Sequence, residues 1–129
     1  MRIVSEDQRC YVEIAPTSQG YDICDLKAHV DTGHGQLSAE SFGVPLLKLA
    51  EFVEAFEAFV SNRKLMPRLE GVYDTYLLFR ARGLEVWFEF SVGQANYYHT
   101  HNLTGQFKID SDFLSQYLSE FRKLVMAAY

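Results

Sequence analysis

The chain has 129 residues, of which 48% are hydrophobic and 15% aromatic, and it carries a formal charge of −5. This length is typical of one domain, and the apolar content is sufficient for a hydrophobic core, which excludes a disordered chain. The acidic charge argues against general nucleic-acid binding, because such binding needs a basic surface that displaces counterions. We therefore expect one globular domain that spans residues 1–129.

Cys10 and Cys24 are the two cysteines, and neither belongs to a C-x-x-C pair, which excludes zinc ribbons and thioredoxin-like redox sites. Buried, reduced thiols are expected; a disulfide would require their two strands to be neighbours in a suitable register. The first residues show no secretory signal, and no apolar run approaches the ~20 residues that span a bilayer. We expect a cytoplasmic protein that does not bind membranes.

The first third of the chain has the alternating pattern of half-buried strands. Cys10, Val12 and Ile14 are apolar between polar neighbours, and "PTSQG" at 16–20 is a turn. A second strand alternates from Cys24 onward in a register opposite to that of the residues before it, which predicts a bulge near residue 23. "TGHG" then predicts a hairpin turn into a strand over about 36–43.

Two later segments carry apolar residues at helical spacing. The first begins with Pro45, which is suited to the first helical position, and predicts a helix over about 45–61. Asp110 or Ser111 is expected to cap the second helix, over about 111–127, by accepting a hydrogen bond from its first turn.

Between these helices, "TYLLFRARGLEVWFEFSV" at residues 75–92 predicts a β-hairpin. Its two apolar sets share a face only if directly opposed positions sum to an odd number. An Arg82-Gly83 turn satisfies this condition by pairing Ala81 with Leu84, and it places Arg80 opposite Glu85 as an ion pair.

A last strand is expected over about 98–109, with Leu103, Phe107 and Ile109 on one face. No repeat, linker or low-complexity segment is apparent. The predicted fold is therefore an α+β domain, in which an antiparallel sheet of about six or seven strands has both amphipathic helices packed on one face.

The order of these elements, with a helix "PLLKLAEFVEAFEAF", an aromatic-rich meander and a closing helix "FLSQYLSEFRKLV", resembles the WapI-type immunity proteins. These are small bacterial α+β proteins that neutralise a toxin domain by binding it. The resemblance covers most of the chain and rests on the spacing of apolar residues. It implies an immunity role and brings no catalytic residues to this sequence.

"ANYYHTHNLTG" at residues 95–105 contains His99 and His101. Residues two apart on a strand point to the same side, about 6.5–7 Å apart, so two imidazoles can face one metal ion. A third ligand would have to come from elsewhere, and the available groups are His29, Asp31 and His34 in "HVDTGHG". Because the pair shares the apolar face of its strand, we expect neutral rings near an edge of the core. A metal-binding protein or metal-dependent enzyme is the alternative interpretation.

No nucleophile elbow and no phosphate-binding loop is visible, so we predict neither catalytic residues nor a cofactor. The polar face of the hairpin is a candidate surface for a protein partner or for self-association, because Trp, Tyr and Arg are enriched in interface hot spots. The expected register places Leu78 opposite Trp87 and Tyr76 opposite Glu89. The leading hypothesis is a non-enzymatic binding protein that uses Tyr76, Leu78, Arg80, Arg82, Glu85, Trp87 and Glu89.

Overall fold

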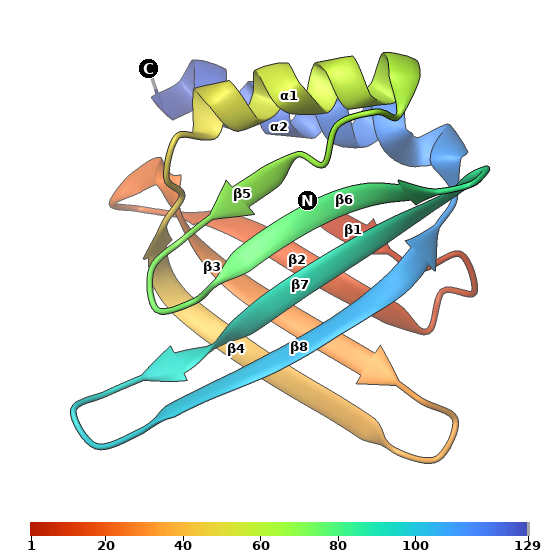
Figure 1. Cartoon of the computed structure of the whole chain (residues 1–129). Coiled ribbons are helices and arrows are strands. Elements are labelled where there is room, and N and C mark those ends of the chain that lie inside the picture. Colours follow the sequence, from red (N-terminus) through yellow and green to blue (C-terminus); the bar gives the residue numbers. More distant parts are fainter. Residues whose placement is uncertain (129) are drawn as a thin grey trace.

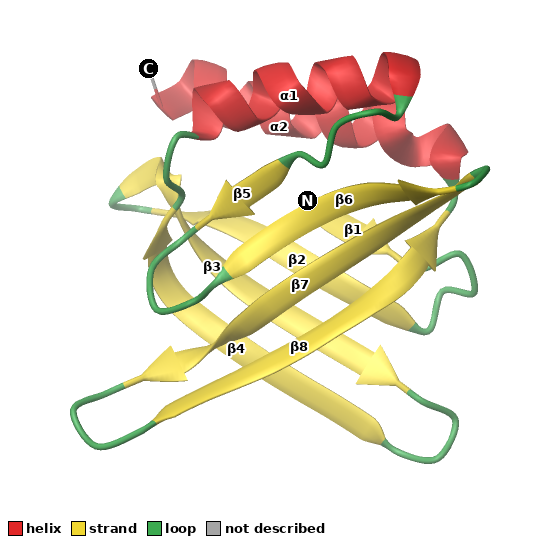
Figure 2. Ribbon diagram, in the orientation of Figure 1, coloured by secondary structure: helices red, strands yellow, loops and turns green. Residues whose placement is uncertain are grey.

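Residues 1–128, the part of the chain that the computed structural model describes, form eight β-strands and two α-helices (Figures 1 and 2). The first half contains β1 (Arg2–Val4), β2 (Cys10–Thr17), β3 (Gly20–Asp31), β4 (Gln36–Pro45) and α1 (Leu49–Asn62). The second half contains β5 (Arg68–Glu70), β6 (Tyr76–Arg82), β7 (Glu85–Ala95), β8 (Thr100–Ile109), a short 3-10 helix (Ser111–Phe113) and α2 (Leu114–Ala128).

The α+β class is confirmed, but the single sheet of six or seven strands is wrong. Two four-stranded antiparallel sheets are present among residues 1–128, in the orders β1-β2-β3-β4 and β5-β6-β7-β8. Each half of the chain is thus a four-stranded meander followed by a helix. The sequence reveals no such repeat, because alternating apolar residues say which side of a strand is buried and not which strands are neighbours.

The strands of the two sheets cross one another, and α1 and α2 lie side by side across one end of them (Figure 1). The inner faces of both sheets and the apolar sides of both helices form one hydrophobic core. Its centre is aromatic: the ring centroid of Phe56 lies 4.6 Å from that of Phe79, and Phe79 lies 4.9 Å from Phe88. Phe121 of α2 completes the cluster by an edge contact with Phe56.

Helix α1 begins later than the sequence predicts. Pro45 is the last residue of β4 and pairs with Ile23, so its assignment as the first helical residue is wrong. The next residues stay extended because Leu46 N–H bonds to a carbonyl of β3 and Leu47 N–H bonds to a carbonyl of β5. The helix starts only after Lys48, which adopts a left-handed conformation with φ 54°.

The cap of the second helix is confirmed, since the Asp110 side chain accepts a hydrogen bond from the N–H of Asp112. That cap opens the 3-10 helix, and α2 follows without a break at Leu114. Within residues 1–128, neither helix has both the length and the apolar character that crossing a bilayer requires.

Both cysteines are free thiols. Strands β2 and β3 are neighbours, but Cys10 pairs with Val30 whereas Cys24 pairs with Pro16, so the two thiols are not in register for a disulfide. The predicted bulge near residue 23 corresponds to a register shift between Cys24 and Leu26 where β3 meets β4.

The β6–β7 hairpin turns one residue later than predicted. Arg82 pairs with Glu85, so the turn consists of Gly83 and Leu84, and Arg80 faces Trp87 instead of Glu85. Gly83 has φ +62°, which a glycine accepts at the first central position of a tight hairpin turn. The odd-sum rule still holds, but Leu84 is 102% exposed and does not contribute to the core.

Candidate functional site

The polar side of the β6–β7 hairpin forms the outer face of the second sheet. We call this surface the Trp87 face; it consists of Tyr76, Leu78, Arg80, Arg82, Glu85, Trp87 and Glu89. The seven predicted residues lie together because the one-residue shift of the turn leaves each side chain on its original side of the hairpin. In the described part of the chain, the helices cross one end of the sheets and leave this face uncovered (Figure 1).

The partners across the hairpin differ from those predicted. Leu78 lies opposite Glu89 instead of Trp87, and Tyr76 lies opposite Ser91 instead of Glu89. Leu78 is only 7% exposed, because the long polar side chains around it shield it from water. It therefore serves as an apolar base beneath the charged groups.

Glu89 holds two arginines on this face. Its carboxylate oxygens lie 3.4 Å from Nη2 of Arg80 and 3.5 Å from Nη2 of Arg82, and its side chain is 20% exposed. The guanidinium of Arg82 also lies over the ring of Trp87, 4.7 Å from the ring centroid. Such contacts contribute about 0.5–1 kcal/mol at exposed sites and fix the orientation of both groups.

Two hydrogen-bond donors on the Trp87 face are buried without an acceptor. Among residues 1–128, Nε of Arg80 and Nε1 of Trp87 have no hydrogen-bond partner, although these two residues are directly opposed. The Glu85 carboxylate lies beside the indole but outside good hydrogen-bonding geometry. A buried donor without an acceptor costs about 1–3 kcal/mol, so this pair of groups requires an explanation.

Lys108 of β8 extends the Trp87 face toward the first sheet. Its Nζ lies 3.1 Å from Glu85 and 3.2 Å from Glu6 in the β1–β2 turn. The hydrogen bond and charge of Lys108 lower the pKa of Glu85, and the hydrogen bonds with Glu85 and Glu6 raise the pKa of Lys108. The two hairpin strands alone do not reveal Lys108, because its pairing with Trp87 emerges only once β8 is aligned with β7.

The histidine pair lies elsewhere, where the β7–β8 hairpin extends beyond the core. His99 and His101 share one side of the hairpin as predicted, and their ring centroids are 4.6 Å apart. The expected position near the core is wrong, because both side chains are exposed. The two histidines lie on the same side of the strand as Leu103, as predicted, but the hairpin continues past the last residues that the first sheet covers (Figure 1).

The other two histidines do not complete a metal site. His29 stacks on Tyr11 with ring centroids 5.3 Å apart, and its Nδ1 lies 3.1 Å from the Ser38 hydroxyl. His34 lies in the exposed β3–β4 turn. Within residues 1–128, no group of three or more His, Cys, Asp or Glu side chains is arranged to hold a metal ion. The alternative interpretation, a metal site built from His99, His101 and a third histidine of the same chain, therefore finds no support in the described residues.

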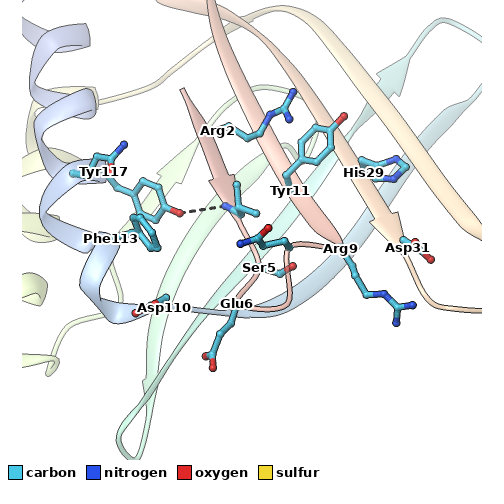
Figure 3. Close-up of a pocket in the computed structure, with 13 residues that line it drawn as sticks. Arg2, Ser5, Glu6, Arg9, Tyr11, His29, Asp31, Asp110, Phe113 and Tyr117 are labelled. Carbon is cyan, nitrogen blue, oxygen red and sulfur yellow. Dashed lines mark hydrogen bonds between the residues drawn. The ribbon is translucent and has the colours of Figure 1, made fainter.

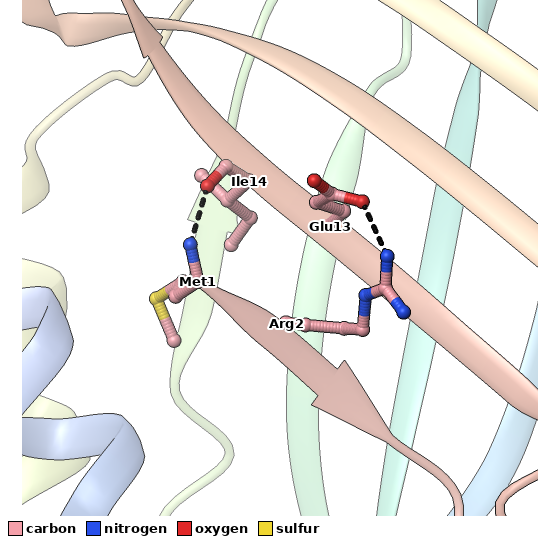
Figure 4. A network of polar contacts seen from close by, with 4 residues as sticks. All are labelled: Met1, Arg2, Glu13 and Ile14. Carbon is pink, nitrogen blue, oxygen red and sulfur yellow. Dashed lines mark hydrogen bonds and ion pairs between the residues drawn. The ribbon is translucent and has the colours of Figure 1, made fainter.

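A hollow of about 710 Å³ lies between the N-terminal strands and the start of α2 (Figure 3). The Tyr117 hydroxyl accepts a hydrogen bond of 3.2 Å from the N–H of Val4, and burial raises the pKa of Tyr117. Figure 4 shows how the edge strand beside this hollow is fixed: the Met1 ammonium donates to the carbonyl of Ile14, 2.8 Å away.

Several charged groups near this hollow are engaged with protein groups. Arg2 donates to Glu13 at 3.0 Å (Figure 4), and its guanidinium lies 4.0 Å from the ring centroid of Tyr11. The N–H of Gly33 donates to the Asp31 carboxylate at 2.9 Å. Residues of both charge signs line the hollow, so its chemistry favours no single class of ligand.

No protein-family model, curated protein sequence or solved structure matches this chain. The resemblance to WapI-type immunity proteins therefore stays a prediction, and the case for a function rests on the chemistry of these surfaces.

Proposed function

We propose that the protein binds a protein partner through the Trp87 face and has no enzymatic activity of its own. The observation that carries this proposal is the pair of buried donors, Nε of Arg80 and Nε1 of Trp87, which lie without acceptors on an otherwise ordered surface. Neighbouring side chains cover both donors in the free protein, so a partner that shifts these side chains and supplies a carboxylate or carbonyl oxygen would remove the cost of both donors. Binding would then gain free energy that folding alone does not recover.

The composition and order of the face also support the proposal. It combines Trp87 and Tyr76 with Arg80 and Arg82. Arg68 of the neighbouring β5 lies beside the face, with its guanidinium 4.2 Å from the ring centroid of Tyr76. These are the residue types that dominate interface hot spots. Because Arg68 and Arg82 already stack on the two aromatic rings, docking would cost little further side-chain entropy.

The resemblance to WapI-type immunity proteins suggests the class of partner. We propose a bacterial toxin domain that this protein neutralises in the cytoplasm by direct binding, without a cofactor, membrane or nucleic acid. On this proposal the Trp87 face blocks the toxin by covering its surface. A toxin residue with an exposed carboxylate, flanked by apolar groups, would match the two free donors and the rings of Trp87 and Tyr76.

The experiment co-expresses the protein with a toxin domain encoded beside its gene and measures both cell survival and the dissociation constant of the purified pair. Trp87→Ala should weaken binding at least 30-fold and abolish protection, as expected for a central hot-spot residue. Tyr11→Ala is the matched control, because Tyr11 is also a half-buried aromatic residue under an arginine, on the outer face of the other sheet.

Thermal unfolding of both variants establishes that they are folded, and Trp87→Phe, which keeps an aromatic ring but loses the indole N–H, provides a milder test. An unchanged dissociation constant for folded Trp87→Ala would exclude the Trp87 face. Absence of any binding to the toxin domain would exclude the immunity role.

A further inference from the structure

We propose that His99 and His101 form half of a zinc site that a second copy of the chain completes, so that zinc joins two molecules through their β7–β8 hairpins. This inference concerns a surface separate from the Trp87 face and goes beyond the partner proposed above. It rests on the geometry of the histidine pair, on its missing ligands, and on the charge and exposure of the hairpin.

The two imidazoles are positioned for one ion. Their ring centroids lie 4.6 Å apart. Two nitrogens bound to tetrahedral zinc at about 2.0–2.1 Å are roughly 3.4 Å apart, which small side-chain rotations reach from this separation. Both rings are exposed, and the contact recorded for them within residues 1–128 is a long one, 3.4 Å between the Asn96 amide nitrogen and Nε2 of His99. Zinc can displace so weak a contact.

One molecule supplies only part of a ligand set. A hollow of about 310 Å³ beside the pair is also lined by Glu40 of β4, but in the described chain no third His, Cys, Asp or Glu joins the two histidines in metal-binding geometry. Structural zinc takes four ligands, so two coordination positions remain for groups from outside. A second molecule related by a two-fold axis presents the same two histidines and closes a site with four histidines.

The hairpin is also the region where two copies of this acidic chain can meet. The whole chain carries a formal charge of −5, whereas residues 90–107 contain no Asp, Glu, Lys or Arg. Two such hairpins approach without direct like-charge repulsion, and the positive charge of the bound ion offsets part of the charge of both molecules.

The tip of the hairpin offers apolar surface for this contact. Tyr97 and Tyr98 directly precede the histidine pair and are 95% and 87% exposed. The hairpin points away from the two helices (Figure 1), so they do not obstruct a second hairpin. Burial of the tyrosine rings between two copies would add to the coordination bonds.

The test measures the molar mass of the full chain by light scattering after chelator treatment and again during titration with ZnCl₂. We expect a monomer that becomes a dimer at one zinc ion per two chains and that reverts on addition of EDTA. Saturating zinc should tighten dimerisation at least 100-fold. His99→Ala and His101→Ala should each abolish the effect, whereas His34→Ala, at an exposed histidine of another hairpin, should retain it.

Three results would overturn the proposal: no zinc binding at ~100 μM, binding of one ion per chain without a change in mass, or zinc-dependent dimerisation that survives His99→Ala. The variants lie outside the core, and equal melting temperatures without zinc verify their folding. Trp87→Ala should dimerise with zinc like the unaltered chain, which separates this test from the test of partner binding.

Discussion

Ser41→Ala should lower the free energy of unfolding by about 2–3 kcal/mol, although it removes a single oxygen atom. Ser41 of β4 is 2% exposed, and its hydroxyl donates to the carbonyl of Gly93 and accepts from the N–H of Gly93 at 2.8 Å. Pairing between β6 and β7 ends at Tyr76 and Ser91, so the backbone of Gly93 has no neighbouring strand on the β6 side. The Ser41 hydroxyl takes the place of that strand and links the two sheets.

The magnitude follows from the two backbone groups that alanine would leave unpaired. Each buried unpaired group costs about 1–3 kcal/mol, and the lower part of this range applies because Gly93 is only half-buried. Equilibrium unfolding in urea measures the difference, which should appear as a midpoint about 1 M lower at an unchanged slope. Ser38→Ala is the control on the same strand, since Ser38 is exposed, and it should change stability by less than about 0.5 kcal/mol. A loss below about 1 kcal/mol for Ser41→Ala would refute this account and indicate that water satisfies Gly93.

Gly93→Ala should destabilise by about 3 kcal/mol or more in thermal unfolding, because the added Cβ would lie 1.9 Å from the carbonyl oxygen of His101 and displace β8; a neutral result would contradict the close approach of these strands. The free energy of unfolding of Leu84→Asn in urea should stay within about 0.5 kcal/mol of that of the unaltered chain, and a loss above 1 kcal/mol would show that Leu84 contributes to the core. Burial raises the pKa of Cys24 from 9.0 to about 11, so the thiol ionises first in the unfolded chain and stability should fall by roughly 2 kcal/mol between pH 9 and 11. Cys24→Ala should remove this part of the pH dependence of unfolding, and identical profiles for both chains would disprove it.

The sequence predicts on which side of its strand each residue lies, but it does not predict how the strands are grouped into sheets. Alternation correctly placed the residues of the Trp87 face on one side of the hairpin, because a shift of the turn that keeps the odd sum leaves every side chain on its own side. The predicted Arg82-Gly83 turn lies one residue too early, because the prediction treats the apolar Leu84 as a core residue, whereas Gly83 favours the first central position of the turn. Grouping into two sheets depends on long-range packing that no local pattern contains.

The histidine pair shows the same limit. Its side of β8 could be predicted from Leu103, two residues beyond His101, yet its exposure could not. The exposure of the two histidines depends on how far the β7–β8 hairpin extends beyond the first sheet. That extension is set by the lengths of β7 and β8 and by the way the two sheets cross. The uncharged composition of residues 90–107 was visible in the sequence, and it gains meaning only once those residues form an extended hairpin.

Both halves of the chain form a four-stranded antiparallel sheet followed by a helix, so the outer faces of the two sheets can be compared directly. Both sheets carry an aromatic ring under an arginine, Tyr11 under Arg2 and Trp87 under Arg82. In the first sheet, the row through Tyr11 continues to His29, whose ring nitrogen contacts a hydroxyl of the next strand. In the second sheet, the row through Trp87 contains the two buried side-chain donors that lack an acceptor within residues 1–128. The same architecture can therefore satisfy such a row internally, so the unpaired donors are a local property of the Trp87 face. That property is what an acceptor from a bound partner would use.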